Sequence, residues 1–175
     1  AHAEPAAELP AVMITLGARL HLRSKRADRW LSADEFFTGL FATALQTGEL
    51  LTTVEVPMLL ERTGYAFEEL ARRHGDFALL GVAATVTVDE TGACRDARIT
   101  LVNPGAGAER MQRAASSLIG RAIDDAAARA AGEIAAADIT ATGDVHASAA
   151  YRRQLARVLT RRTLLRAFER ARQVR

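Results

Sequence analysis

Residues that build disulfides and metal centres are scarce in this chain. Cys94 is the only cysteine, so no disulfide can form within the chain. The four histidines, His2, His21, His74 and His146, are scattered and do not have the spacing of metal ligands. These absences favour a reducing compartment, which we expect to be the cytoplasm, and they predict no metal site in this chain.

Long apolar runs are missing as well. The longest, at residues 78–86, has the length of a strand, whereas a membrane span needs about 18 apolar residues. The N-terminal segment AHAEPAAELP has neither a basic leader nor an apolar stretch, so it does not resemble a secretory signal. Because the sequence does not begin with methionine, we expect it to be part of a longer, globular protein without a membrane span.

Lysine is nearly absent, because Lys25 is the only lysine among 23 basic residues. The remaining basic residues are arginines, and 21 acidic residues leave a formal net charge of +2. A chain of 175 residues, 49% hydrophobic and 25% charged, suffices for one sizeable core or for two small lobes. The charge balance by itself does not indicate a partner.

Signatures of covalent catalysis are also absent. The sequence has no G-x-S-x-G motif, and Cys94 lies where we expect a hairpin turn. Asp124 and Asp125 are expected in the first turn of a helix, and Glu68 and Glu69 on the surface of a strand. The loop NPGAGAER has neither a Walker lysine nor G-x-G-x-x-G spacing, so it is a weak candidate for phosphate binding. These observations exclude a hydrolase of the usual kinds.

Capping signals and alternating apolar residues predict the elements of the N-terminal third. A short helix is expected at residues 6–16, with Gly17 as its stop. Ser32 and Glu35 have the spacing of a capping box, and the phenylalanine pair after Glu35 is expected to begin the buried face of a helix. Strands are expected at residues 19–24 and at residues 50–56, the second ended by Pro57.

The rest of the chain changes from extended to helical patterns. From Gly64 it is mostly extended, with a break at Gly75 and Asp76, a β-branched run at residues 82–88, a turn at 89–93 and a further run at 97–102. These runs predict an antiparallel meander. Helices are expected at residues 115–120, 123–137 and about 148–172. Strands followed by helices predict an α+β fold, with residues 1–61 lacking a complete core of their own and residues 62–175 forming a second domain.

The last helix is rich in arginine. A basic helix is compatible with nucleic-acid binding, and arginine is also enriched at protein interfaces. A third interpretation is favoured, in which one apolar stripe is buried and most arginines lie on the solvated side. The arginines are Arg152, Arg153, Arg157, Arg161, Arg162, Arg166, Arg170, Arg172 and Arg175, and the expected stripe is Tyr151, Leu155, Val158, Leu159, Leu165 and Phe168.

The segment RRHGD, at residues 72–76, also has two interpretations. Gly75 and Asp76 suit a tight turn, because glycine adopts positive φ freely and aspartate can hydrogen-bond its own backbone. A strand connection without any chemistry therefore explains the local composition.

Four segments together resemble the flavoprotein (medium) subunit of the molybdenum hydroxylases, the xanthine dehydrogenase and carbon monoxide dehydrogenase family. They are AHAEPAAELPAV, ADEFFTGLFATALQTGELLTTVEVP, YAFEELARRHGDFALLGVAA and DVHASAAYRRQLARVLTRRTLLRAF. Their order and spacing cover nearly the whole chain. The Gly-Gly turn that precedes the first segment in the family is missing here, and so is the N-terminal subdomain with its glycine-rich pyrophosphate loop. The resemblance therefore implies only part of an FAD site in this chain.

The resemblance also implies roles for particular residues. Ala1 and His2 would approach the FAD, Glu8 takes the family's acidic position, and Leu51 matches a leucine that packs on the cofactor. Asp76 and Phe77 would lie in a loop that reaches toward the isoalloxazine ring, where the Phe77 ring would control access of the final electron acceptor. Glu68 stands where xanthine dehydrogenases place a lysine, so that contact is not carried over.

By resemblance, the chain is an oxidoreductase subunit that relays electrons rather than one whose side chains make bonds. A substrate would be hydroxylated at a molybdopterin cofactor in a large subunit, and electrons would pass through [2Fe–2S] clusters in a small subunit to FAD and then to an acceptor. The C-terminal domain would be a three-stranded sheet with a helical bundle, and the complex a dimer of heterotrimers. The alternative is a non-enzymatic module whose basic last helix binds a protein or a nucleic acid.

Overall fold

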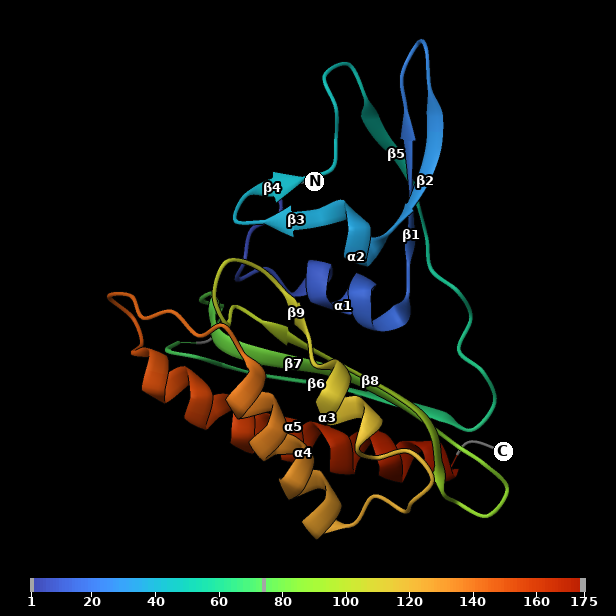
Figure 1. Ribbon diagram of the computed structural model, residues 1–175, viewed down its shortest axis with the longest axis vertical. Coiled ribbons are helices and arrows are strands. Elements are labelled where there is room, and N and C mark those ends of the chain that lie inside the picture. Colours follow the sequence, from blue (N-terminus) through green and yellow to red (C-terminus); the bar gives the residue numbers. More distant parts are fainter. Residues whose placement is uncertain (1, 74, 174–175) are drawn as a thin grey trace.

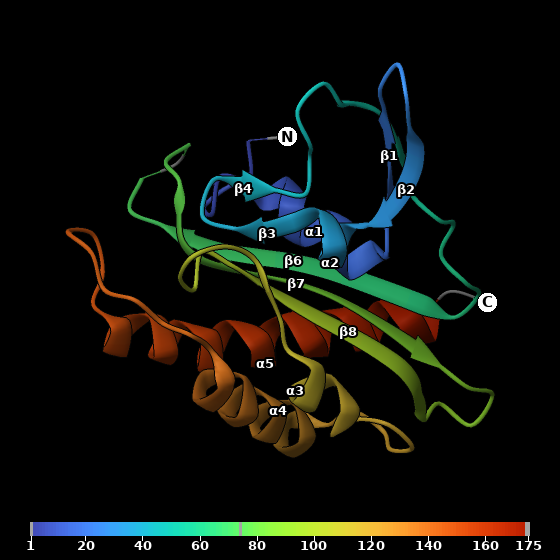
Figure 2. The same ribbon diagram turned by 45° about the horizontal axis from the view of Figure 1, so that its top comes forward.

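The computed structural model describes residues 2–73 and 75–173. These residues form three layers, which Figures 1 and 2 show from two directions. The N-terminal elements lie on one face of a long antiparallel sheet, and helices from the last third of the chain cover the other face. The α+β fold expected from the sequence is confirmed.

The N-terminal layer is built around a small three-stranded antiparallel sheet of order β2-β1-β5. Its first helix ends at Gly17, as predicted, where a φ of 69° provides the left-handed C-cap. The predicted strand at residues 50–56 is present and ends before Pro57. The elements of this layer are α1 (Glu8–Leu16), β1 (Arg19–Arg23), β2 (Asp28–Ser32), α2 (Ala33–Phe36), β3 (Phe37–Gly39), β4 (Ala42–Thr43) and β5 (Leu50–Glu55).

The predicted capping box is present at the start of α2. The Ser32 hydroxyl accepts a hydrogen bond from the Glu35 backbone N–H, and the Glu35 carboxylate accepts one from the Ser32 backbone N–H. The expected continuation of the helix is wrong, because α2 ends after one turn and Phe37 begins β3. Phe36 enters the core, where it is fully buried with Leu20 and Leu22 of β1, and the half-buried Phe37 packs against this cluster.

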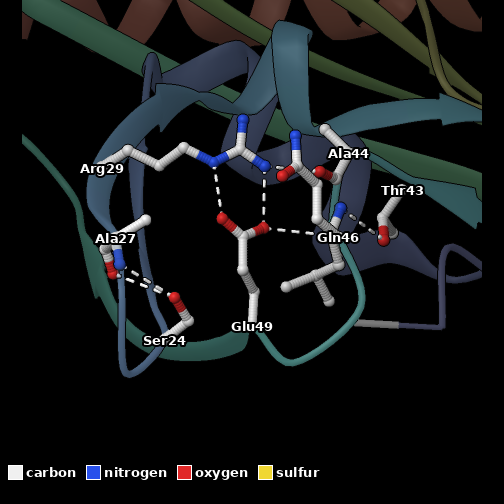
Figure 3. Close-up of polar contacts among 8 residues, drawn as sticks. Ser24, Ala27, Arg29, Thr43, Ala44, Gln46 and Glu49 are labelled. Atoms are coloured by element: carbon white, nitrogen blue, oxygen red, sulfur yellow. Dashed lines mark hydrogen bonds and ion pairs between the residues drawn. The ribbon is translucent and has the colours of Figure 1, made fainter.

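A polar link joins β2 to the segment ahead of β5 (Figure 3). The Arg29 guanidinium donates two hydrogen bonds of 2.8 Å to the Glu49 carboxylate and one of 2.7 Å to the Ala44 carbonyl. The Gln46 backbone N–H donates to the same carboxylate at 2.8 Å. The Glu49 side chain is only 4% exposed, and these hydrogen bonds, those from Arg29 first, lower the pKa of its carboxyl to about 2. This link fixes the chain where β5 begins.

The C-terminal sheet is the predicted meander with one short strand added. Its order is β6-β7-β8-β9, with all pairs antiparallel. Every residue of β7 is buried, because the helical layer covers one face while Ala11 of α1 packs with Ala78 and Val102 on the other. The strands are β6 (Thr63–Ala71), β7 (Ala78–Val88), β8 (Cys94–Val102) and β9 (Glu109–Arg110).

The helical layer consists of α3 (Gln112–Ser116), α4 (Asp125–Asp138) and α5 (Ala149–Gln173). Asp124 caps α4 by accepting a hydrogen bond from the Ala127 N–H, one position ahead of the expected first turn, and Asp125 lies in that turn as expected. The alanine-rich face of α4 lets α5 approach closely, since a Cβ at Gly132 would lie 2.5 Å from the Arg157 carbonyl oxygen. No helix in the described residues is both long and apolar enough to cross a membrane.

Three expectations about side chains were wrong. Tyr151 and Val158, expected in the buried stripe of α5, are 44% and 37% exposed, and Arg152 is buried instead. Leu155, Leu159 and Phe168 are buried as expected, and small residues such as Ala156 and Thr160 complete the buried face. Glu68 is not a surface residue, because Arg162 and Arg166 of α5 cover its carboxylate. Cys94 is not in a turn, since it begins β8 and is buried.

Candidate functional site

A cavity of about 500 Å³ lies at one end of the C-terminal sheet, where separate parts of the chain meet. Its walls come from residues 4–6, the β3–β4 turn, the β6–β7 connection, the loop after β8 and the segment ahead of α5. In both ribbon views the β6–β7 connection and the segment ahead of α5 lie at this same end of the sheet (Figures 1 and 2). A cavity of this volume is in the range of sites for small molecules or cofactors, which is about 300–1,000 Å³.

Two phenylalanine rings border this cavity and are largely free of contacts within the chain. Phe41, in the β3–β4 turn, is 62% exposed, and Phe77, directly before β7, is 70% exposed. Large aromatic side chains usually bury most of their surface, and their flat faces favour stacking with other rings. This pair is therefore suited to contact a flat, apolar ligand.

The backbone around the cavity has unusual conformations. Among the described residues, four that are not glycine have positive φ, and three of them lie at or beside the cavity: Ala3 (51°), Phe41 (50°) and Asn103 (55°). Two backbone hydrogen bonds hold them in place, from the Phe41 N–H to the Ala3 carbonyl at 3.2 Å and from the Asn103 N–H to the Pro5 carbonyl at 3.0 Å. Such conformations cost about 1–3 kcal/mol each and cluster at functional sites.

An ion pair between a buried arginine and a half-exposed aspartate forms the inner wall. Arg152 of α5 is 2% exposed and donates a hydrogen bond of 2.7 Å to the Asp144 carboxylate. The backbone N–H groups of His146 and Ala147 donate to the other oxygen of Asp144, at 2.8 and 2.9 Å. These contacts, that of Arg152 first, lower the pKa of the Asp144 carboxyl to about 2, so it is ionised at neutral pH. The pair fixes the segment ahead of α5.

The structure brings together some of the residues that the sequence singled out. Asp76 and Phe77 both line the cavity. His2 is exposed and does not line it, although Glu4, two residues further on, does. Ala1 lies outside the described residues.

Glu8 and Leu51 lie elsewhere. Glu8 is exposed in the first turn of α1, close enough to Glu69 of β6 to help raise the pKa of the Glu69 carboxyl, for which burial is the larger cause. Leu51 is half-buried in β5, opposite Leu22 of β1, and packs on the N-terminal core. In this chain the two residues do not share a cavity with Phe77.

Sequence reasoning missed Phe41, Asn103 and Arg152 as parts of the site. Asn103 stands in the NPGAG loop, which was considered only for phosphate binding. Arg152 was counted with the solvated arginines. Its spacing was a usable signal, because Arg152, Ala156, Leu159 and other buried residues of α5 recur at steps of three and four.

Most of the arginines of the basic helix α5 are paired with acids of this chain. Arg157 binds Glu133 at 2.7 Å and Arg161 binds Asp125 at 2.6 Å. Glu68 is held by Arg162 at 3.2 Å and by Arg166 at 3.1 Å. Because these guanidinium groups already have carboxylate partners, the helix is poorly suited to follow a nucleic-acid backbone.

The chain matches two protein families that adjoin along its length. Residues 1–59 match the FAD binding domain in molybdopterin dehydrogenase, and residues 65–167 match the CO dehydrogenase flavoprotein C-terminal domain. It is 40% identical over 98% of its length to the 6-hydroxypseudooxynicotine dehydrogenase complex subunit alpha of Paenarthrobacter nicotinovorans. It is 34% identical, again over 98% of its length, to the carbon monoxide dehydrogenase medium chain of Afipia carboxidovorans.

A solved structure shows the same fold. The crystal structure of quinoline 2-oxidoreductase from Pseudomonas putida 86 matches 98% of this chain with a TM-score of 0.90 and 37% identity, and 59% of that chain is covered. The chain likewise spans 58% and 59% of the length of the two curated relatives. From these matches, the chain belongs to the family of flavoprotein, or medium, subunits of the molybdenum hydroxylases.

Proposed function

We propose that this chain forms part of the FAD site in the flavoprotein subunit of a molybdopterin-dependent hydroxylase or dehydrogenase. The observation that carries the proposal is the cavity bordered by Phe41 and Phe77. It lies where the part of the chain that matches an FAD-binding domain meets the part that matches the flavoprotein C-terminal domain.

The residues present fit a flavin. The exposed rings of Phe41 and Phe77 offer flat apolar surface, and the Asp76 carboxylate adds a polar group beside it. We assign these residues and the Glu4–Ala6 turn to contacts with the ring system. Ala1, His2, Glu8 and Leu51 remain assigned to the cofactor by family resemblance. When bound, FAD would accept electrons from iron–sulfur clusters and pass them to an external acceptor.

The chain's own residues would bind, orient and shield rather than react. Among the described residues that line the cavity, no side chain is arranged as a nucleophile with a base, and the carboxylate of Asp144 is already held by Arg152 and two backbone N–H groups. Phe77 would cover the cofactor on the side from which an acceptor approaches. Its exposed ring can exclude water and bulky molecules without taking part in the chemistry.

The proposal extends to partners and organisation. We assign molybdopterin to a large subunit and [2Fe–2S] clusters to a small subunit, in a dimer of heterotrimers located in the cytoplasm. The names of relatives support a complex, because they include a complex subunit and medium chains. We place the division between the FAD-binding part and the C-terminal domain at residues 61 and 62, supported by the separate apolar clusters of the N-terminal layer and the C-terminal sheet.

Flavin retention by the full-length subunit tests the proposal. The purified protein should be yellow, and Phe77→Ala should retain FAD about two- to tenfold more weakly, which is the value of one aromatic contact. Phe67→Ala is the matched control, because Phe67 is exposed on β6 and does not line the cavity. A colourless protein that binds DNA in a salt-sensitive manner would support the alternative of a non-enzymatic module.

A further inference from the structure

The first two carbonyl groups after Phe77 are each held by a side chain from another part of the chain. The Ala78 carbonyl accepts a hydrogen bond of 2.6 Å from the Asn103 amide. The Leu79 carbonyl accepts one of 3.1 Å from Nε of Arg152. Both donors line the same cavity as Phe77. The start of β7 is therefore anchored by side chains as well as by its neighbouring strands.

Arg152 connects this point to the segment ahead of α5. Its three kinds of nitrogen bind three different places: Nε binds Leu79, Nη1 binds the Thr142 carbonyl at 2.6 Å, and Nη2 binds Asp144. The Arg152 side chain is 2% exposed, so its guanidinium depends on these partners in place of water, although the Asp144 side chain is itself 42% exposed. Loss of one partner of a buried guanidinium strongly destabilises the folded protein. This cost favours a single arrangement of Arg152 and its three acceptors.

Asn103 connects the same point to the N-terminal layer. Its backbone N–H donates to the Pro5 carbonyl, while its side chain reaches Ala78. Its φ of 55° is one that asparagine tolerates better than most residues. The residue therefore joins the Glu4–Ala6 wall of the cavity to the start of β7.

Phe77 has little else to hold it. Its side chain is 70% exposed, and the preceding turn is closed by a hydrogen bond of 3.2 Å from the Asp76 N–H to the Arg73 carbonyl. The ring is one residue away from the carbonyl that Asn103 holds and two from the one that Arg152 holds. Its direction over the cavity is consequently set by where β7 begins.

We propose that Asn103 and Arg152 are positioning residues that fix the start of β7, so that the Phe77 ring selects electron acceptors by size at the flavin. The selection of electron acceptors rests on the proposed function, whereas the anchoring of β7 does not. Small acceptors such as oxygen pass beside the ring whatever its exact direction. The passage of flat, bulky acceptors depends on the direction of the Phe77 ring. Asn103 and Arg152 therefore set the preference between small and bulky acceptors.

Hydrogen exchange in the holoprotein tests the anchoring. In Arg152→Lys the charge remains but the three separated donors are lost, and amides near the start of β7 should exchange about tenfold faster or more. Asn103→Gly removes the amide while keeping a residue suited to positive φ, and should give a similar local change. Arg157→Lys is the matched control on the same helix, where only exposed contacts with Glu133 and Gln154 are altered. Unchanged exchange in both variants would overturn the proposal.

Flavin reoxidation tests the selection. After reduction with dithionite, the ratio of reoxidation rates with dichlorophenolindophenol and with oxygen should change severalfold in Arg152→Lys and in Phe77→Ala. In the Phe77→Ala background, Arg152→Lys should cause no further change, because it acts through that ring. An additional change in the double variant would show that Arg152 acts by another route and would overturn the proposal. A wild-type protein without flavin would instead reject the proposed function, while the exchange experiment would still decide on the anchors.

Discussion

The two sheets of this chain are stabilised in different ways. In the N-terminal layer, β5 is largely exposed, and a short list of apolar residues around Phe36, Leu20 and Leu22 forms the core. In the C-terminal sheet, every residue of β7 is buried between the helical layer and α1. The first depends on a few large side chains and on polar links such as Arg29 with Glu49, and the second on close packing of many small residues.

The difference explains where the cavity lies. Close packing leaves no room inside the C-terminal sheet, and the thin N-terminal layer has too small a core to enclose a ligand alone. Residues 4–6 and the β3–β4 turn instead meet the rigid end of β7, and the strained conformations of Ala3, Phe41 and Asn103 lie at that meeting point. A rigid partner on one side makes such strain tolerable.

The strongest test of the comparison removes the one large ring of the N-terminal core. Phe36→Ala should lower the free energy of unfolding by about 4 kcal/mol, since it removes a fully buried phenylalanine from a cluster with few neighbours. Hydrogen exchange should accelerate in β1, β2 and β5 while α4 and α5 stay protected. Equal acceleration in both regions would show that they unfold as one unit.

The next largest effect concerns the close packing of the C-terminal sheet. Gly64→Ala should lower the free energy of unfolding by about 3 kcal/mol, because its Cβ would lie 2.0 Å from the Ala167 carbonyl oxygen and 2.3 Å from the Ala171 nitrogen. Both are backbone atoms of α5, so no side-chain rotation can relieve the clash. Gly107→Ala is the control, since a Cβ there meets nothing within 4 Å. Denaturant unfolding measures the stability of both variants. Equal stability of Gly64→Ala and Gly107→Ala would refute the packing argument.

A smaller, pH-dependent effect tests the polar link of the N-terminal layer. The pKa of the Glu49 carboxyl falls from 4.5 to about 2 on folding, so its contribution is fully present above pH 4.5 and is lost as the pH falls toward 2. Glu49→Gln should therefore have a lower melting temperature than the wild type at neutral pH, with the difference closing in acid. Glu61→Gln, outside the link, should show no such trend. A difference that does not depend on pH would contradict this account.

The smallest effect is expected at the contact between the two regions. Burial and the nearby Glu8 raise the pKa of the Glu69 carboxyl above its ordinary value of 4.5. The folded state is thus penalised when Glu69 ionises, and stability falls as the pH rises through the folded pKa. Glu69→Gln should slightly raise the melting temperature at neutral pH and have no effect below pH 4.5. A lower melting temperature at neutral pH would show that the charge is stabilising.

Local signals in the sequence predicted the elements that local chemistry determines. The capping box at Ser32, the stop at Gly17 and the turn at residues 89–93 depend on neighbours within a few positions, and all three are present. The helix was expected to continue through Phe37, but Phe37 begins β3, which pairs with β4 across a short turn. The pattern of α5 was right in part, because Leu155, Leu159 and Phe168 are buried as expected. The buried face also includes Arg152 and small residues such as Ala156 and Thr160, while Tyr151 and Val158 are exposed.

The candidate site was less predictable because it is made by segments far apart in sequence. Asp76 and Phe77 were found through family resemblance, and the turn chemistry of Gly75 alone gave no function. Arg152 and Asn103 act through carbonyl groups that lie 73 and 25 positions away, and no spacing rule connects them. Only the packing of α5 and β8 against β7 brings these donors to the same strand.

The single thiol of the chain is a natural reporter of local opening. Cys94 is 1% exposed, and burial raises its pKa to about 11. At neutral pH only about one molecule in ten thousand carries the reactive thiolate, and that sulfur is covered. A thiol reagent can modify the native protein only after β8 has come away from its neighbours. The rate of labelling therefore measures how often this part of the fold opens, without any introduced probe.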